Sequence, residues 1–172
     1  ATGPLGELLD PAGTLSFDGA NDTFSQMIAA GAAAGADVIA IETMTDLNET
    51  RAALLAAKEQ TELPVLCTMT FEQNGRTFTG CSVPSMAMTL EGLGADAVGI
   101  NCSLGPDQLP PLVEEMARWT RLPLVVKPNA GLPDPSSQEY DILPDDFAGY
   151  MAALVPYGIK IAGGCCGTTP DY

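Results

Sequence analysis

Histidine is absent from this 172-residue chain. Mechanisms that need an imidazole as base or as metal ligand are therefore excluded within the chain, and serine and cysteine triads are excluded with them. Basic residues are also scarce, with seven lysines and arginines against 22 aspartates and glutamates and a net charge of −15. That charge repels a phosphate backbone or an anionic lipid surface, so we expect neither nucleic acid nor a membrane as a partner.

Long apolar runs are missing too. No stretch approaches the roughly 20 residues that cross a bilayer, and the first residues lack the basic-then-apolar order of a secretory signal. We therefore expect a soluble, cytoplasmic protein of one domain. Five cysteines in such a chain predict reduced thiols, metal ligands or small buried residues more than a disulfide framework, and their odd number agrees.

Short apolar segments rich in branched residues recur along the chain and predict buried strands. These segments are 37–41, 64–68, 96–100, 122–126 and 158–162. Segments with helical spacing lie between them, at about 20–34, 46–59, 84–94, 106–119 and 144–156. Strand and helix alternate in units of roughly 30 residues, which predicts an α/β fold with a parallel sheet, and both a barrel and an open doubly wound sheet fit this pattern.

Three cysteines follow predicted strands. Cys102 comes directly after the third strand, and the pair Cys165 and Cys166 follows the last one. Ligands bind at the carboxyl ends of strands in parallel α/β folds, so these thiols are expected to converge. Catalytic zinc usually has three protein ligands and an open fourth position. Three thiolates would supply these ligands and leave the fourth position open. The flanking residues Gly163, Gly164 and Gly167 allow the backbone to turn tightly.

The alternative interpretation is that these cysteines are small buried residues, because free cysteine is among the most buried residue types. Packing is the better explanation for an isolated cysteine, and we apply it to Cys67, inside a strand, and to Cys81, in or after a loop. A glycine-flanked pair together with a third thiol at another strand end favours a metal site.

Two further polar residues stand at strand ends. Glu42 follows a buried strand, and an unpaired buried carboxylate is costly, so it is expected to meet a cation or accept hydrogen bonds. A substrate ammonium and a lysine, arginine or backbone amide of the protein are equally compatible with its position. Asp46 is better explained as a helix cap. Asn101 is placed to orient a ligand or to close a turn.

Four motifs together resemble the homocysteine S-methyltransferase family, and most closely the homocysteine-binding module of cobalamin-dependent methionine synthase. They are Ile-Glu-Thr at 41–43, Gly-Ile-Asn-Cys-Ser-Leu-Gly-Pro at 99–106, Lys-Pro-Asn-Ala-Gly-Leu-Pro at 127–133 and Gly-Gly-Cys-Cys-Gly-Thr-Thr-Pro at 163–170. The resemblance covers nearly the whole chain. It implies a (β/α)8 barrel, here a partial barrel with about five strands.

The resemblance also implies roles for residues. Cys102, Cys165 and Cys166 match the family's zinc ligands, and Glu42 matches the glutamate that holds the amino group of homocysteine. Asn101 is a second candidate for contact with the substrate. The opening motif of the family barrel has no counterpart, so we expect residues 1–172 to form a homocysteine-binding domain that lacks the first strands and stops just before the last helix.

The expected activity is transfer of a methyl group to the sulfur of homocysteine, giving methionine. Zinc would favour the substrate thiolate, whose thiol has a pKa around 8.5 when free. The resemblance to the cobalamin-dependent branch implies methylcobalamin as the donor. Because the chain shows no corrinoid-binding feature, we expect another module or protein to carry it. Three alternatives stay open: a noncatalytic zinc-binding remnant, a methyltransferase that uses betaine or S-methylmethionine, and an α/β protein whose cysteines merely pack.

Overall fold

The computed structural model describes residues 1–137 and 139–172, and it contains a five-stranded parallel sheet. The strands are β1 (Ile39–Met44), β2 (Val65–Met69), β3 (Ala97–Asn101), β4 (Leu124–Lys127) and β5 (Ile159–Ala162). The helices are α1 (Phe17–Ala33), α2 (Leu47–Gln60), α3 (Val83–Gly92), α4 (Pro110–Trp119) and α5 (Pro144–Leu154), with 3-10 turns η1 (Pro106–Gln108) and η2 (Val155–Tyr157). All five predicted strands are confirmed.

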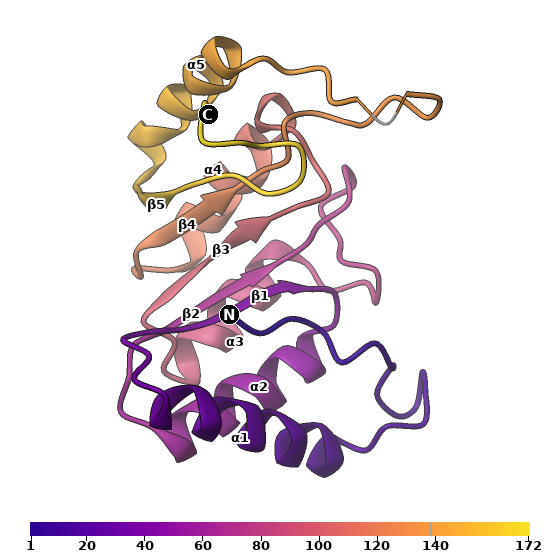
Figure 1. Cartoon of the computed structure of the whole chain (residues 1–172), viewed down its shortest axis with the longest axis vertical. Helices are drawn as coiled ribbons and strands as arrows, with labels where there is room; N and C mark the ends of the chain where they lie inside the picture. Colours follow the sequence, from indigo (N-terminus) through magenta and orange to yellow (C-terminus); the bar gives the residue numbers. More distant parts are fainter. Residues whose placement is uncertain (138) are drawn as a thin grey trace.

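The order of the strands decides between the two architectures that the sequence left open. Each strand pairs with the next one along the chain, in the order β1-β2-β3-β4-β5, and the sheet curves as an arc (Figure 1). A doubly wound sheet reverses its strand order at a switch point, whereas a barrel wall does not. The sheet is therefore part of a barrel wall.

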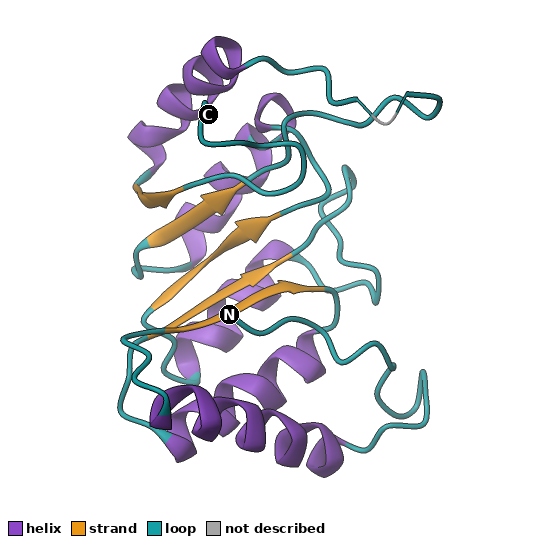
Figure 2. Ribbon diagram, in the orientation of Figure 1, coloured by secondary structure: helices purple, strands orange, loops and turns teal. Residues whose placement is uncertain are grey.

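Side chains alternate across this wall. One set, exemplified by Ile41, Cys67 and Ile100, belongs to the apolar core that includes helix residues such as Leu54 and Met86. The other set faces away from the helices, which cover the outer side of the arc (Figure 2). The concave face of the sheet is thus left to the remaining side chains, as in the interior of a barrel.

The concave face changes from apolar to polar along the strands. Leu66 is in register with Ala97 near the strand starts, whereas Asn101 is in register with Lys127 at the carboxyl ends. Between these layers, a Cβ atom added at Gly99 would lie 1.8 Å from the carbonyl oxygen of Val125. Only glycine allows β3 and β4 to approach this closely, so the polar layer depends on a glycine beneath it.

One predicted helix is wrong in its extent. The segment 106–119 was expected to be a single helix, but it divides into η1 and α4, which begins at Pro110. Pro110 and Pro111 have no amide hydrogen to donate, so a continuous helical ladder from Pro106 cannot form. Prolines are tolerated in the first turn of a helix, which explains why α4 begins there.

The start of α2 is fixed by two carboxylates. The Asp46 side chain accepts a hydrogen bond from the Glu49 amide at 2.8 Å, which confirms the predicted cap. Glu49 is buried and accepts from the Leu5 amide at 2.6 Å, and burial raises its pKa. Through this bond the first residues of the chain are tied to α2.

The outer edge of β1 is partly covered by these first residues. Thr2 forms a parallel bridge with Ile41, in which the Thr2 amide donates to Ala40 and the Glu42 amide donates to Thr2. The backbone of Glu42 is thereby held from the outer side of β1. Within the described part of the chain, no helix combines the length and the apolar character that crossing a membrane requires.

Candidate metal centre

Three thiols meet at the carboxyl ends of β3 and β5. The Sγ atoms of Cys102, Cys165 and Cys166 all lie within 4.8 Å of one another. The Cys102 and Cys166 sulfurs are 3.8 Å apart, and those of Cys165 and Cys166 are 4.0 Å apart. The predicted convergence of these residues is confirmed, although 64 positions separate Cys102 from Cys166.

The backbone at the ends of β1 and β3 adopts an uncommon conformation. Thr43, Cys102 and Ser103 have φ angles of 61°, 63° and 61°, in the left-handed region that residues other than glycine seldom occupy. The Cys102 amide donates to the Lys127 carbonyl at 3.0 Å, and the Leu104 amide donates back to Cys102 at 2.8 Å. Strained positions cost about 1–3 kcal/mol each and cluster at functional sites.

The segment after β4 holds the backbone of the cysteine pair. The Cys165 amide donates to the Pro128 carbonyl at 2.8 Å, and the Cys166 amide donates to the Asn129 side chain at 3.1 Å. The Ala130 amide returns a bond to the Cys166 carbonyl at 2.9 Å. Sequence reasoning missed this role of Asn129, for which the only signal was a polar residue shortly after a predicted strand. The structure shows that Asn129 is nearly fully buried.

The glycines around the cysteine pair do not all provide the tight backbone turn that the sequence predicted. Gly163 and Gly164 are not among the residues with positive φ, so neither provides a left-handed turn. At Gly164 the requirement is space, since an added Cβ would lie 2.4 Å from Thr168. Gly167 needs both properties, with φ of 81° and the Tyr140 ring 2.3 Å from the position of a Cβ.

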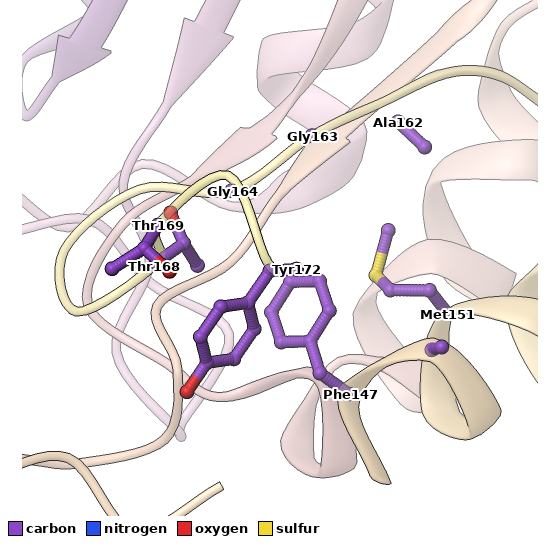
Figure 3. Close-up of a pocket in the computed structure, with 9 residues that line it drawn as sticks. Phe147, Met151, Ala162, Gly163, Gly164, Thr168, Thr169 and Tyr172 are labelled. Atoms are coloured by element: carbon purple, nitrogen blue, oxygen red, sulfur yellow. The ribbon is translucent and has the colours of Figure 1, made fainter. Parts of the chain in front are cut away.

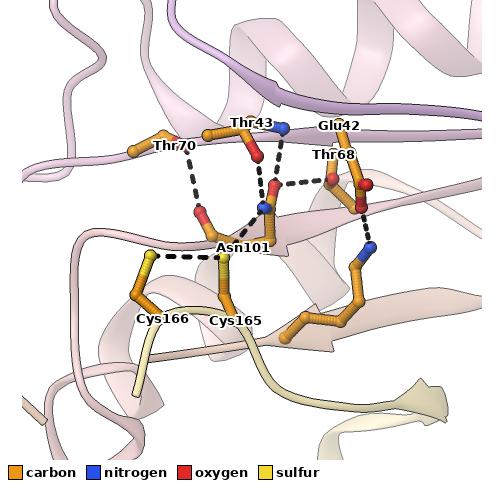
Figure 4. Close-up of polar contacts among 8 residues, drawn as sticks. Glu42, Thr43, Thr68, Thr70, Asn101, Cys165 and Cys166 are labelled. Carbon is orange, nitrogen blue, oxygen red and sulfur yellow. Dashed lines mark hydrogen bonds and ion pairs between the residues drawn. The ribbon is translucent and has the colours of Figure 1, made fainter. Parts of the chain in front are cut away.

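Asn101 joins three strands to the thiols (Figure 4). Its side-chain oxygen accepts from the Thr43 amide at 2.8 Å and from the Thr68 hydroxyl at 2.7 Å. Its side-chain nitrogen donates to the Thr43 hydroxyl at 2.7 Å and lies 3.9 Å from the Cys165 sulfur. Its carbonyl accepts from Thr70. Because Asn101 is 1% exposed, this network orients the strand ends and Cys165. Its contact with substrate stays a prediction.

Glu42 has a partner within the protein. Its carboxylate forms an ion pair with the ammonium group of Lys127, the last residue of β4, so the pair reaches across β2 and β3. Of the two interpretations left open, the chain itself thus supplies the lysine. The two side chains keep 31% and 24% of their surface exposed, so a ligand can still reach both. The predicted role of Glu42 toward a substrate ammonium stays a prediction.

The environment of Cys102 favours a neutral thiol when no cation is bound. Burial raises its pKa to about 12, and the neighbouring Cys165 thiol adds to the rise. Thiolates, not thiols, ligate metals, so a metal that binds here must displace protons.

The spacing of the sulfurs fits one ion. Zinc–sulfur bonds of about 2.3 Å in tetrahedral geometry place ligand sulfurs roughly 3.8 Å apart. Two of the sulfur–sulfur separations, 3.8 and 4.0 Å, agree with this value before any rearrangement. Thiolate donors also favour zinc over the hard cations magnesium and calcium. The three thiols therefore fit a zinc ion in both their spacing and their donor chemistry.

The other two cysteines lie elsewhere. Cys67 is fully buried on the helix side of β2, and burial raises the pKa of its thiol to about 12. Its predicted role in packing is confirmed. Cys81 lies in the loop before α3, where its thiol donates to the Ser82 carbonyl at 3.3 Å. Neither residue belongs to the thiol cluster.

A hollow of about 230 Å³ lies beside the cysteine segment, between α5 and the end of β5 (Figure 3). Phe147, Met151, Gly164 and Tyr172 contribute to its lining, but none of the three clustered cysteines does. The hollow borders the helix layer, whereas the thiols stand with the polar layer of the concave face. It is therefore separate from the candidate metal centre.

Known proteins resemble this chain in sequence and in fold. The profile of the homocysteine S-methyltransferase family matches residues 1–172. Methionine synthase from Mycobacterium tuberculosis is 36% identical over 146 residues, which are 80% of this chain and 12% of that protein. The chain thus spans about an eighth of the length of this curated relative.

Solved structures agree. The apo form of the homocysteine methyltransferase MmuM from Escherichia coli superposes with a TM-score of 0.78 and 26% identity, covering 98% of this chain and 57% of that one. The metallated form of the same enzyme has a TM-score of 0.70 and 26% identity, covering 87% of this chain and 49% of that one. The five-stranded arc accordingly corresponds to part of such a barrel. This chain belongs to the homocysteine S-methyltransferase family.

Proposed function

We propose that this chain binds zinc through Cys102, Cys165 and Cys166 and presents homocysteine for methylation at sulfur, which gives methionine. The observation that carries the proposal is the set of three sulfurs within 4.8 Å at the carboxyl ends of β3 and β5. Similarity to methionine synthase and to a homocysteine methyltransferase supports the choice of substrate.

The metal and the protein have separate tasks in this proposal. Zinc bound by three cysteines would supply a cation that lowers the pKa of the substrate thiol from about 8.5, so that the thiolate exists at neutral pH. Asn101 holds Cys165 in place, and the Pro128–Ala130 backbone holds the loop of the cysteine pair. Since the chain has no histidine, the thiol proton leaves to solvent instead of a protein imidazole.

The proposal also includes the methyl donor. We assign methylcobalamin, carried by a separate module or protein, as the methyl donor. The support is the similarity to methionine synthase, of which this chain spans 12%, so that most of that relative lies outside the matched region. A cytoplasmic location is part of the proposal, because the cytosol keeps the three thiols reduced.

Zinc content tests the site. Reduced protein should contain about one zinc per chain by elemental mass spectrometry, and Cys102→Ala, Cys165→Ala and Cys166→Ala should each lose it. Cys81→Ser is the matched control, because its sulfur lies outside the cluster, and it should keep the metal. Full zinc in all three alanine variants would refute the assignment.

Ligand protection and turnover test the reaction. Homocysteine should slow zinc loss to a mild chelator if its sulfur takes the open position. Methionine formation should then be measured with methylcobalamin, S-methylmethionine and betaine supplied in parallel. Turnover with methylcobalamin alone supports the proposed donor, and turnover with another donor contradicts it. Zinc binding without methionine from any donor identifies a noncatalytic zinc-binding protein.

A further inference from the structure

A tyrosine from the segment between β4 and α5 stands beside the thiol cluster. Tyr140 forms an antiparallel bridge with Pro133, which closes this segment on itself. Two residues further on, the Ile142 amide donates to the Ala130 carbonyl at 3.0 Å, and the Ala130 amide donates to the Cys166 carbonyl at 2.9 Å. The backbone that carries Tyr140 is therefore tied through Ala130 to the backbone of the cysteine pair.

The ring of Tyr140 packs directly on the backbone of Gly167. A Cβ atom added at Gly167 would lie 2.3 to 2.7 Å from three carbon atoms of this ring. Carbon atoms that are not bonded pack at about 3.5–4.0 Å, so a residue with a side chain would displace the ring. The last glycine of the Gly-Gly-Cys-Cys-Gly motif thus makes room for an aromatic ring next to Cys166.

The hydroxyl group of Tyr140 interacts with the sulfur of Cys166. Burial raises the pKa of this hydroxyl above its ordinary 10.0, and Cys166 adds to the rise by charge and by a side-chain hydrogen bond. A hydrogen bond raises the pKa of a phenol when the phenol is the donor, because the bond stabilises the protonated form. Cys166 is the most exposed of the three clustered cysteines, so this contact lies where the cluster opens to solvent.

Each of the three sulfurs then has a hydrogen-bond donor of its own. Cys102 has a hydrogen bond from the backbone of the residue that follows it. The side-chain nitrogen of Asn101 lies 3.9 Å from the Cys165 sulfur (Figure 4). Tyr140 supplies the third donor, to Cys166. Metal ligands in proteins are commonly oriented by such hydrogen bonds from surrounding residues.

Metal binding strengthens the contact between Tyr140 and Cys166. A thiol that ligates a metal gives up its proton, so the Cys166 sulfur becomes an anion when zinc is bound. Hydrogen bonds to an ionised acceptor are roughly twice as strong as those between neutral groups. The phenol therefore stabilises the metal-bound state more than the metal-free state.

We propose that the Tyr140 hydroxyl donates a hydrogen bond to the Cys166 thiolate in the zinc-bound protein, and that Tyr140 is a positioning residue of the metal centre. This inference rests on the proposed function, because it takes zinc to be bound by the three cysteines. The hydrogen bond holds the exposed thiolate in its ligating position and draws electron density from its sulfur.

Tyr140→Phe removes the hydroxyl and keeps the ring on Gly167. Zinc affinity, measured by competition with a chromophoric chelator, should fall about tenfold. In cobalt(II)-loaded protein, the sulfur-to-metal charge-transfer band should move to lower energy, because a sulfur without its hydrogen bond gives up electron density more readily. Incorporation of 3-fluorotyrosine at position 140 provides a stronger donor of nearly the same shape, so it should move the band to higher energy.

Tyr150→Phe is the matched control, because it removes the hydroxyl of an exposed tyrosine on α5. It should change neither the affinity nor the band. Circular dichroism shows whether each variant folds, and opposite movements of the band at position 140 cannot come from a loss of structure.

The remaining outcomes overturn the inference. A band that stays in place in metal-loaded Tyr140→Phe would reduce Tyr140 to a packing residue, whether or not the affinity falls, and would leave the proposed function intact. A wild type that takes up neither zinc nor cobalt would overturn the proposed function and the role of Tyr140 together.

Discussion

Replacing Asn101 with alanine is expected to destabilise the fold and the metal site together. The side chain makes three hydrogen bonds of 2.7–2.8 Å, to the Thr43 amide, the Thr43 hydroxyl and the Thr68 hydroxyl. Because Asn101 is 1% exposed, water has little access to the groups that its side chain contacts. The partners that remain would lose their hydrogen bonds inside the protein.

The magnitude follows from these partners. A buried donor left without an acceptor costs about 1–3 kcal/mol, so we assign about 2 kcal/mol to the Thr43 amide. The Thr68 hydroxyl can rotate toward another acceptor, and the Thr43 hydroxyl oxygen loses only one donor. We assign about 1 kcal/mol to both together. The free energy of unfolding should therefore fall by about 3 kcal/mol. Zinc affinity should fall about tenfold or more, since Asn101 also positions Cys165.

Urea unfolding of the metal-free protein measures the first effect, and competition with a chromophoric chelator measures the second. Asn48→Ala is the control, because Asn48 is exposed and, among the described residues, its side chain accepts from Arg51 alone. This variant should change stability by less than about 0.5 kcal/mol. A loss below about 1 kcal/mol in Asn101→Ala, with unchanged zinc affinity, would refute the account of Asn101 as the residue that joins the strand ends.

Two further predictions concern the cysteine segment and the amino-terminal ends of the strands. Gly164→Ala should lower the free energy of unfolding by about 1–3 kcal/mol through overlap with Thr168, whereas Gly149→Ala, whose Cβ meets nothing within 4 Å, should raise it by up to about 1 kcal/mol in urea unfolding. Hydrogen bonding from Lys58 lowers the pKa of Asp96 from its ordinary 3.8, so the carboxylate stabilises the fold above about pH 4 and this contribution disappears as pH falls through the lowered pKa. The free energy of unfolding of the wild type should exceed that of Asp96→Asn by under about 1 kcal/mol at pH 7, because the pair is partly exposed. This difference should disappear near pH 2. A difference that grows in acid would contradict the predicted direction of the pH dependence.

Much of this protein could be predicted without coordinates. The apolar segments predict every strand because a strand buried on both faces must be almost wholly apolar, and their regular alternation with helices predicts a parallel sheet. The strand ends of such a sheet share one edge, so the positions of Cys102, Cys165 and Cys166 were sufficient to predict that their thiols meet. Local chemistry also determines the Asp46 cap, which needs only the first turn of its own helix.

Other features were decided by the tertiary structure. The sequential strand order showed a barrel wall, a choice that strand and helix alternation alone cannot make. The curvature of that wall brings Lys127 to Glu42 across 85 positions of sequence, and Asn101 to Thr43 across 58. Such pairings depend on distances between side chains of separate strands, which no local pattern encodes. The sequence alone therefore determined the strands and the thiols, and the curved sheet decided which charged and polar groups surround them.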